Sequence, residues 1–423
     1  MIQFRNARDT ELDFHPHLTV LAGVNGAGKS TVLDAIAILL SWAVTRIRST
    51  GSKGRPIREV DIHNSNNSSA LLMLANGAPM GPFSWSLAQT RKGRNPDINT
   101  TLPTNKLTNL NWLNLWGMTI RTQIGKPTPT KSVPVFVYYP VIRAVLDIPL
   151  RIRKSHSFDL MEAYDEALTG AGNFRLFFEW FRNREDLENE QRADPGTFRP
   201  DPQLEAVRQA LLTFLPHFTR ISVKRNPLRM EVSKGDERLR VDQLSDGEKC
   251  LFAMVGDLAR RLAIANPGVR EPLHGDGIVL IDEIDLHLHP AWQRMVARKL
   301  VETFPNCQFI VSTHSPQVLG EIDAPRIRLL TVDPVHGLVC SVPEQSIGLD
   351  TSAILEVLMD SRSQNEDITK RLDKVFELID RGKHELARKK MQEVRDLARG
   401  ELPELVRAEA LLTMLDCEET PAK

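Results

Sequence analysis

Apolar residues recur along the chain with two periods, which predict strands that alternate with helices. Short continuous apolar runs are typical of strands buried on both faces of a parallel sheet. The predicted buried strands are residues 18–21, 135–139, 277–281 and 308–313. Segments with helical spacing predict helices at residues 32–40, 173–191, 204–215 and 250–264. This alternation predicts an α/β fold with a mixed central sheet.

Between the first two buried strands, the pattern predicts an antiparallel β subdomain and an insertion. Strand signals separated by turn residues occur at 59–63, 70–74 and 83–89. Residues 93–134 are rich in Asn, Thr and Pro, and we expect them to be only partly regular apart from an apolar piece at 110–120.

Phenylalanines form a stripe on the predicted helix at 173–191 and are expected to pack into the core of a helical lobe. The stripe comprises Phe174, Phe177, Phe178 and Phe181. The expected solvent side comprises Arg175, Glu179, Arg182, Asn183 and Asp186. Residues 159–168 also show helical spacing, and strand signals at 221–225 and 229–233 bring the chain back to a sheet.

The C-terminal part of the chain is predicted to be a small helical bundle. Helical spacing covers residues 366–381, 383–398 and 403–415, with Gly382 and Gly400 between them. The patterns together predict four regions along the chain. These regions are a first lobe at 1–150, a helical lobe at 151–240, a motif-rich region at 241–345 and the helical tail at 346–423.

Composition limits the class of protein without choosing a function. A chain of 423 residues is too long for one core and predicts two or three lobes. Lys and Arg total 54, as do Asp and Glu, so any basic surface must be local. The four cysteines lack metal-binding spacing and predict a reducing compartment. No apolar run is expected to span a membrane, so the predicted location is the cytoplasm.

One local basic segment, residues 46–58, combines cationic side chains with Gly and Ser. Two interpretations stay open, namely a solvated loop and a contact with the phosphate backbone of nucleic acid. Residues 91–94 and 151–154 carry further groups of cations that would serve the same DNA contact.

The segment after the first buried strand has the G-x-x-x-x-G-K-[ST] spacing of a phosphate-binding loop, with a strand before it and a helix after it. Its glycines let backbone N–H groups curl round phosphate oxygens at the helix N-terminus. Lys29 is expected to reach the β- and γ-phosphates, and the Ser30 hydroxyl to bind Mg²⁺. The predicted nucleotide-contacting residues of the loop are Asn25, Gly26, Ala27, Gly28, Lys29, Ser30 and Thr31.

Two carboxylates end the buried strand at 277–281, at the edge where an open α/β sheet places ligands. Asp282 is expected to hold hydrated Mg²⁺, and Glu283 to act as general base on the attacking water. The next buried strand ends at His314. This histidine suits a γ-phosphate sensor because imidazole can donate to a phosphate oxygen and orient the water.

Residues 244–249, Leu-Ser-Asp-Gly-Glu-Lys, precede the predicted helix at 250–264. Ser245 has the position of an N-cap, and Gly247 permits a close approach of backbone to ligand. A helix start with a small residue makes an anion site, which here is expected to face a γ-phosphate. A purely structural helix cap is the alternative. The predicted contact residues are Ser245, Asp246, Gly247 and Glu248.

These four motifs, in this order, resemble the Walker A, signature, Walker B and switch-histidine motifs of the ABC-type ATPases. Asp246 in place of a signature glycine is similar to the SMC, RecF, RecN and OLD branches. The resemblance implies a P-loop NTPase head that binds ATP and Mg²⁺, hydrolyses ATP and dimerises head to tail. In that dimer Ser245 and Gly247 would act on the ATP of the partner subunit.

Residues 283–290 resemble the D-loop of the same branches. His287 and His289 are therefore expected at a dimer contact, with a metal site as the alternative that H-x-H spacing leaves open. The glutamine of the Q-loop, which binds Mg²⁺ in this family, has no clear match in the chain. Gln89 and Gln123 fit its order only loosely.

Softer patterns distinguish branches of the family. The tail is short and helical, unlike a Toprim nuclease, and no segment is long enough for a coiled-coil arm. Residues 174–190, 135–143 and the tail from Gly348 resemble the PtuA-type ATPases of Septu and retron-linked anti-phage systems. This resemblance implies a homodimer or higher homo-oligomer that controls a partner effector, an HNH nuclease. The alternatives are a RecF-like DNA-repair ATPase and a transporter-associated ATPase.

Overall fold

In a computed structural model, the chain forms two compact units, Met1–Leu349 and Asp350–Lys423. The structure describes residues 1–49, 52–64, 67–76, 83–95, 110–124, 132–141, 159–169, 174–193, 198–267, 269–360 and 365–418. Each unit buries apolar side chains of its own.

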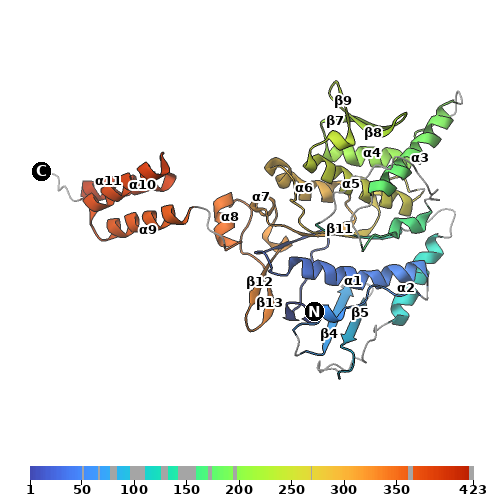
Figure 1. The fold of residues 1–423 in the computed structure, drawn as a ribbon, viewed down its shortest axis with the longest axis horizontal. Helices are drawn as coiled ribbons and strands as arrows, with labels where there is room; N and C mark the ends of the chain where they lie inside the picture. The colour runs from blue at the N-terminus through green and yellow to red at the C-terminus, as the bar shows by residue number, and fades with distance from the viewer. Residues whose placement is uncertain are drawn as a thin grey trace. The chain divides into compact units, whose positions relative to one another are not determined.

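A ten-stranded mixed sheet forms the centre of the first unit, in the order β5-β4-β1-β2-β13-β12-β3-β11-β10-β6 (Figure 1). Its strands are β1 (Ile2–Phe4), β2 (Ala7–Asp9), β3 (Leu18–Ala22), β4 (Ser69–Asn76), β5 (Phe83–Thr90), β6 (Val135–Tyr139), β10 (Gly277–Ile281), β11 (Cys307–Ser312), β12 (Ile327–Asp333) and β13 (Gly337–Ser341). The strands from β12 to β6 run parallel, and the others pair antiparallel. The predicted α/β fold with a mixed sheet and an antiparallel β part is confirmed.

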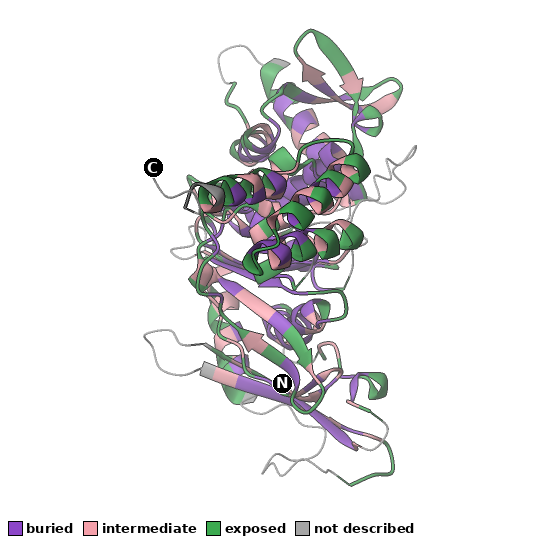
Figure 2. Cartoon of the chain, turned by 90° about the vertical axis from the view of Figure 1, so that its left-hand side faces the viewer, coloured by how far each residue is buried: buried purple, intermediate pink, exposed green. Residues whose placement is uncertain are grey.

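Helices cover both faces of this sheet, with α1 and α2 on one face and α4, α5 and α6 on the other (Figure 1). The helices of the first unit are α1 (Lys29–Arg48), α2 (Leu110–Ile124), α3 (Phe174–Ala193), α4 (Pro202–Phe214), α5 (Asp246–Ala265), α6 (Pro290–Thr303) and α7 (Pro316–Leu319). Figure 2 shows that buried residues run along the strands of the sheet and through the helices packed on it. The core therefore lies between these layers.

The parallel register places the C-terminal ends of β3, β11 and β10 next to one another. Ser312 at the end of β11 lies opposite Leu21 of β3, and Ile281 at the end of β10 lies opposite Val311 and Tyr139. The continuous apolar runs explain this placement, because a central parallel strand is covered on both faces. The loops that follow β3, β10 and β11 therefore leave the sheet side by side.

A second, three-stranded sheet lies beyond α4 and α5, away from the central sheet (Figure 1). It consists of the antiparallel strands β7 (Phe218–Arg225), β8 (Leu228–Lys234) and β9 (Glu237–Arg240). Its alternating pattern buries one face and leaves the other accessible. The buried side chains of the inner face are Ile221, Val223, Met230 and Val232.

Two predicted segments have a different local structure. Residues 59–63, predicted as a strand, contain a 3-10 turn at Glu59–Asp61, because the Asp61 carboxylate accepts a hydrogen bond from the Arg58 N–H and tightens the backbone. Residues 159–168, predicted as a helix, form only the 3-10 helix Leu160–Tyr164. The guanidinium of Arg261 binds the carbonyl oxygens of Ala163 and Asp165, which a longer helix would need for its own hydrogen bonds.

The phenylalanine stripe of α3 is buried as predicted. All four side chains have exposed fractions of 1% or less, and the Phe177 ring meets Phe252 of α5 edge-on at 5.9 Å. Glu179, expected on the solvent side, is instead buried. Its carboxylate pairs with the Arg175 guanidinium at 3.1 Å, one turn earlier on the helix.

The length and composition of α1 would allow it to cross a membrane, contrary to the expectation that no apolar run is long enough. However, 78% of its most apolar window is buried in the protein. This burial is typical of a core helix in a layered α/β fold, where both the sheet and α2 cover it.

The second unit consists of helices, as predicted for the C-terminal part of the chain. They are α8 (Thr351–Val357), α9 (Glu366–Asp380), α10 (His384–Ala398) and α11 (Pro403–Glu418). Apolar residues at helical spacing on the last three helices form a separate core. Its buried members include Leu372, Val375, Met391, Val394, Leu405 and Leu412.

Candidate active site

The loop between β3 and α1 turns through three glycines with positive φ, Gly23, Gly26 and Gly28, and ends at a helix N-terminus; we call it the cradle. Helix α1 begins at Lys29, and its N-cap residue Gly28 has φ +99° with no side-chain cap. A side chain at this φ is strained, and its Cβ would also lie 2.6 Å from Nδ2 of Asn6, so glycine is strongly favoured at this position. The first turn contains no acidic residue, so the positive end of the helix dipole is not neutralised there. This arrangement suits an anion such as a phosphate.

Lys29 lies within this cradle and is buried. Its Nζ donates hydrogen bonds to the carbonyl oxygens of Gly23 (2.8 Å) and Val24 (3.1 Å). Burial lowers the pKa of Lys29, while the carboxylates of Asp282 and Glu283 act in the opposite direction. The other predicted loop residues divide by exposure. Asn25, Gly26 and Ser30 are exposed, Gly28 and Thr31 are partly buried, and Ala27 is buried.

Asp282 and Glu283 follow β10 directly and are fixed by the neighbouring strands. The Asp282 N–H donates to the Tyr139 carbonyl (2.9 Å), and its carboxylate accepts from the Ser312 hydroxyl (2.5 Å). The same Ser312 oxygen accepts from the Glu283 N–H (2.8 Å). Glu283 has φ +49°, a left-handed conformation that is uncommon for a residue with a side chain. Such strain is often found at functional sites, where the surrounding structure maintains it.

Sequence patterns alone missed Ser312 and Asp285. The Asp285 carboxylate accepts hydrogen bonds from the Thr313 hydroxyl (2.5 Å) and from the His314 N–H (3.4 Å). It therefore joins the D-loop-like segment to the residues that follow β11. The position of Asp285, two residues after Glu283, was the only signal in the sequence. Its partners Thr313 and His314 become evident only from the register between β10 and β11.

His314 is partly buried beside the same groups. Burial, and then the charge of Lys29, lower the pKa of His314 below its ordinary 6.5, although Asp285 and Glu283 oppose the shift. The neutral imidazole is therefore favoured near neutral pH. A neutral ring can donate one hydrogen bond and accept another.

We expect NMR titration of His314 in the nucleotide-free protein to give a midpoint below 6.5. Because the folded form resists protonation, stability associated with His314 is present above pH 6.5 and is lost as pH falls through the lowered pKa. Lys29→Met should move the midpoint upward, since it removes a nearby positive charge. Arg407→Met, on the second unit, is the control and should leave it unchanged. A midpoint above 6.5 in the wild type would contradict this description of the site.

Ser245 caps α5 as predicted. Its hydroxyl accepts from the Glu248 N–H (3.3 Å), and the Glu248 carboxylate accepts from the Ser245 N–H (2.9 Å), which completes a capping box. Glu248 is buried and also accepts from Lys234 of β8 (3.0 Å). Ser245 and Asp246 are exposed. Of the predicted contact residues, these two are the ones most accessible to a ligand.

Gly247 packs directly on the D-loop-like segment of its own chain. A Cβ at this position would lie 2.6 Å from the backbone oxygen of His287, a distance that real Cβ contacts do not show. His287 itself has φ +62°. The backbone at the start of α5 therefore packs in direct contact with the backbone of the residues after Glu283.

Gly247→Ala is expected to reduce the ATPase rate by about tenfold or more, because overpacking against backbone displaces one of the two segments. Nucleotide binding at the cradle of the same chain should be retained. Gly400→Ala is the control and should keep the wild-type rate, since the nearest atom to its added Cβ is the Ala398 carbonyl oxygen at 3.9 Å, an ordinary contact. A Gly247→Ala protein with wild-type turnover would show that this contact is unimportant.

Neither histidine of the H-x-H pair is placed as a metal ligand. His289 caps α6, with its Nδ1 accepting from the Ala291 N–H (3.3 Å). Across the described parts of the chain, no group of three His, Cys, Asp or Glu side chains could hold a metal ion. The dimer-contact interpretation of His287 and His289 stays a prediction.

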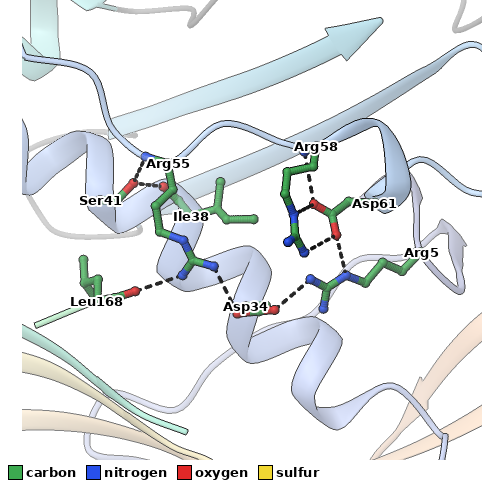
Figure 3. Close-up of polar contacts among 8 residues, drawn as sticks. All are labelled: Arg5, Asp34, Ile38, Ser41, Arg55, Arg58, Asp61 and Leu168. Atoms are coloured by element: carbon green, nitrogen blue, oxygen red, sulfur yellow. Dashed lines mark hydrogen bonds and ion pairs between the residues drawn. The ribbon is translucent and has the colours of Figure 1, made fainter. Parts of the chain in front are cut away.

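The basic segment 46–58 is mostly engaged in structure. Arg55 pairs with Asp34 of α1, which also binds Arg5, and Arg58 pairs with the buried Asp61 (Figure 3). Burial raises the pKa of Asp61, but hydrogen bonds from Arg58 and the charge of Arg5 outweigh it, so this pKa is lowered. The pairs of Asp34 with Arg5 and Arg55 connect the phosphate-loop helix to the turn after β1 and to segment 46–58.

The other two arginines of segment 46–58 also contact neighbouring side chains, whereas its lysine is exposed. Arg46 is buried over the Trp42 ring, and Arg48 pairs with Asp165 at 2.6 Å. Lys53 is exposed and has no hydrogen bond or ion pair to another described residue. Within segment 91–94, the Arg91 guanidinium binds the carbonyl oxygens of Asn67, Ile62 and Asn64. Residues 151–154 lie outside the described residues.

Neither loose candidate for the Q-loop glutamine lies beside the ends of β3, β10 and β11, where the other site residues are found. Gln89 lies on β5, at the far edge of the sheet, where its amide donates to the Thr90 carbonyl (2.9 Å). Gln123 lies in the last turn of α2. Residues 142–158, which follow β6, lie outside the described residues.

A buried ionic cluster connects the capped helix to β6. Asp257 of α5 accepts hydrogen bonds from Arg260 (2.8 Å), Arg261 (2.7 Å) and the Tyr139 hydroxyl (3.0 Å). All four side chains are at most 1% exposed. Burial raises the pKa of Asp257, but the two guanidinium charges outweigh it, so the pKa lies below its ordinary value. In the sequence, this cluster is indicated by an aspartate followed three and four residues later by two arginines, a spacing that places them on one side of a helix.

Taken together, the phosphate-binding cradle, the two carboxylates at the end of β10 and the histidine after β11 define a P-loop ATPase. Comparison with protein families agrees: an AAA domain family matches residues 1–216, and a second AAA domain family, whose description names the AbiEii toxin of type IV TA systems, matches residues 146–320. The chain is 32% identical to the retron Ec83 probable ATPase of Escherichia coli, over 85% of this chain and 75% of that protein. The chain belongs to this family of AAA-domain ATPases.

Two further similarities are more distant. The Septu protein PtuA of Bacillus mycoides is 40% identical over 20% of this chain and 11% of its own length. The crystal structure of an SMC head bound to the C-winged helix domain of ScpA matches with a TM-score of 0.46 and 17% identity, over 81% of this chain and 96% of that one. The predicted ATPase activity and the predicted relationship to retron and PtuA proteins are confirmed.

Proposed function

We propose that two copies of this chain close head to tail on ATP, and that this closure controls a partner effector. The observation that carries the proposal is the exposed, capped start of α5, which has the signature motif but no nucleotide-binding partner identified among the described residues of its own chain. The carboxylates of Asp282, Glu283 and Asp285 instead act on Lys29, the lysine of the phosphate-binding loop. Ser245 and Asp246 are exposed at the start of α5. An exposed helix N-terminus facing a second chain can complete that chain's site.

In this proposal the residues have distinct tasks in hydrolysis. The N–H groups at the start of α1 and the Lys29 ammonium bind the phosphates. The Ser30 hydroxyl and the Asp282 carboxylate would hold Mg²⁺, which neutralises charge on the β- and γ-phosphates when bound. Glu283 accepts a proton from the attacking water, and neutral His314 donates to the γ-phosphate. The Ser245 hydroxyl and the N–H groups of α5 would contact that phosphate from the partner subunit.

The relatives support a role in anti-phage defence, with a nuclease as the effector. The retron and Septu proteins named above resemble this chain, and the resemblance to PtuA-type ATPases implies a separate HNH nuclease as partner. The described residues contain one catalytic constellation, the ATP site, so an effector activity would reside in a partner. Cytoplasmic location follows as a prediction from the same class of protein.

Affinity purification of a tagged Glu283→Gln protein from its native host tests this role. The expected result is a nuclease recovered in stoichiometric amount with ATP and Mg²⁺ and absent from a Lys29→Ala control. Deletion of the gene is expected to raise phage plating efficiency. Recovery of the ATPase alone, together with unchanged phage sensitivity, would contradict the proposal. Recovery with DNA-repair factors would favour the RecF-like alternative.

A further inference from the structure

The three-stranded sheet carries cations on the face that points away from the core. The register places Arg220, Ser233 and Arg238 in one row, Ser222, Glu231 and Arg240 in the next, and Lys224 beside Arg229. These eight residues alternate with the buried side chains of the inner face, so they share the other face. All eight are partly or fully exposed. We call this surface the outer face.

Charge on the outer face is mostly uncompensated. It has five cations and a single carboxylate, that of Glu231, which pairs with Arg229 at 2.6 Å. Arg240 pairs with Asp242 at 3.0 Å. The side chains of Arg220, Lys224 and Arg238 make no hydrogen bond or ion pair with any other described residue. The chain as a whole has no net charge, so this face is a local basic patch.

Neighbouring carboxylates do not neutralise the patch. Three carboxylates line the same cavity as Arg220, and all three already pair with Arg208: Glu185 at 3.5 Å, Glu188 at 3.0 Å and Glu205 at 3.8 Å. Glu185 also pairs with Arg225 at the end of β7 (2.6 Å). This arrangement differs from segment 46–58, where Arg48, Arg55 and Arg58 have carboxylate partners.

We propose that the outer face binds the phosphate backbone of nucleic acid. Guanidinium and ammonium groups on adjacent strands supply the charge, and the Ser222 and Ser233 hydroxyls between them are further donors to phosphate oxygens. The face has no aromatic side chain on which bases could stack. Recognition therefore uses the backbone and is independent of base sequence.

An acidic protein is the other partner that a basic surface could bind. Protein interfaces are usually centred on buried aromatic or apolar anchors with a polar rim. The outer face has polar and charged residues throughout, so its composition favours a polyanion of regular charge spacing over a protein. This binding needs no effector partner and no change in the ATP site.

Fluorescence anisotropy with a labelled DNA duplex of arbitrary sequence tests the proposal on the full chain. The triple variant Arg220→Glu, Lys224→Glu and Arg238→Glu is expected to weaken binding by about tenfold or more. Its salt slope should fall by about 0.9 for each phosphate that the protein no longer neutralises. The matched control reverses three exposed cations of the second unit, Lys383→Glu, Lys389→Glu and Arg407→Glu, and should keep wild-type affinity.

Other results would overturn the proposal. Equal duplex affinity and salt slope in the wild type and the outer-face variant would place binding elsewhere. Binding of polyglutamate without binding of duplex would assign the face to an acidic protein. The substituted side chains lie outside the ATP site and the inner face, so ATP turnover should persist in both variants. Failure of this test would therefore leave the proposed ATP-driven dimer untouched.

Discussion

Replacing Glu283 with Gln is expected to lower the ATPase rate by about a hundredfold or more, because the amide cannot accept a proton from the attacking water. Gln has nearly the same shape, and the Glu283 N–H still binds Ser312, so the strand end should keep its conformation. ATP binding through the Lys29 cradle should be retained. The variant should therefore accumulate as an ATP-bound dimer, which light scattering after size exclusion in ATP and Mg²⁺ would detect.

A matched control is Glu321→Gln, which makes the same chemical change at an exposed position after α7. It should hydrolyse ATP at the wild-type rate and show no excess dimer. A Glu283→Gln protein that turns over normally would assign the base to another group. A protein that binds ATP but stays monomeric would separate hydrolysis from dimer closure.

Asp257→Ala is expected to destabilise the first unit by about 3–5 kcal/mol, because it leaves two buried guanidinium groups without a counter-charge. Arg260 and Arg261 cannot be deprotonated to relieve this cost. All six tryptophans lie within Met1–Leu349, so fluorescence during urea unfolding reports on this unit alone. The expected result is a midpoint shifted to much lower urea concentration.

Glu302→Ala removes one member of an exposed pair with Arg298, 3.7 Å apart, and serves as the control. Exposed ion pairs contribute little, so its unfolding midpoint should stay near that of the wild type. Replacement of the whole cluster by apolar residues of similar volume should recover part of the missing stability. Wild-type stability in Asp257→Ala would show that the cluster is dispensable.

The parts of the fold that sequence predicted are those set by short-range pattern. The β6 strand, Val135–Tyr139, was predicted to the residue because a continuous apolar run ends at Pro140. The phosphate loop, the Ser245 cap and the helices of the second unit also follow from local spacing. Each of these signals lies within one or two turns of the residues it describes.

The parts that sequence missed depend on partners distant in the chain. Ser312 binds both Asp282 and Glu283 only because β10 and β11 are adjacent. Arg55 and Arg58 read as free cations in sequence, yet Asp34 and Asp61 engage them after folding. The basic outer face was equally hidden, because the pairing of β7, β8 and β9 is what brings its cations together. Spacing alone carries no information on such pairings.

The claim that each ATP site is shared between two chains is tested most directly by mixing two inactive proteins. Lys29→Ala removes the phosphate-binding side of the site, and Ser245→Arg blocks the signature side without touching the cradle. In a mixed dimer one composite site keeps both wild-type halves. If the claim holds, an equimolar mixture recovers about a quarter of the wild-type ATPase rate, since random pairing makes half the dimers mixed and each has one intact site of two. Recovery of no activity above that of the separate proteins would contradict the shared site.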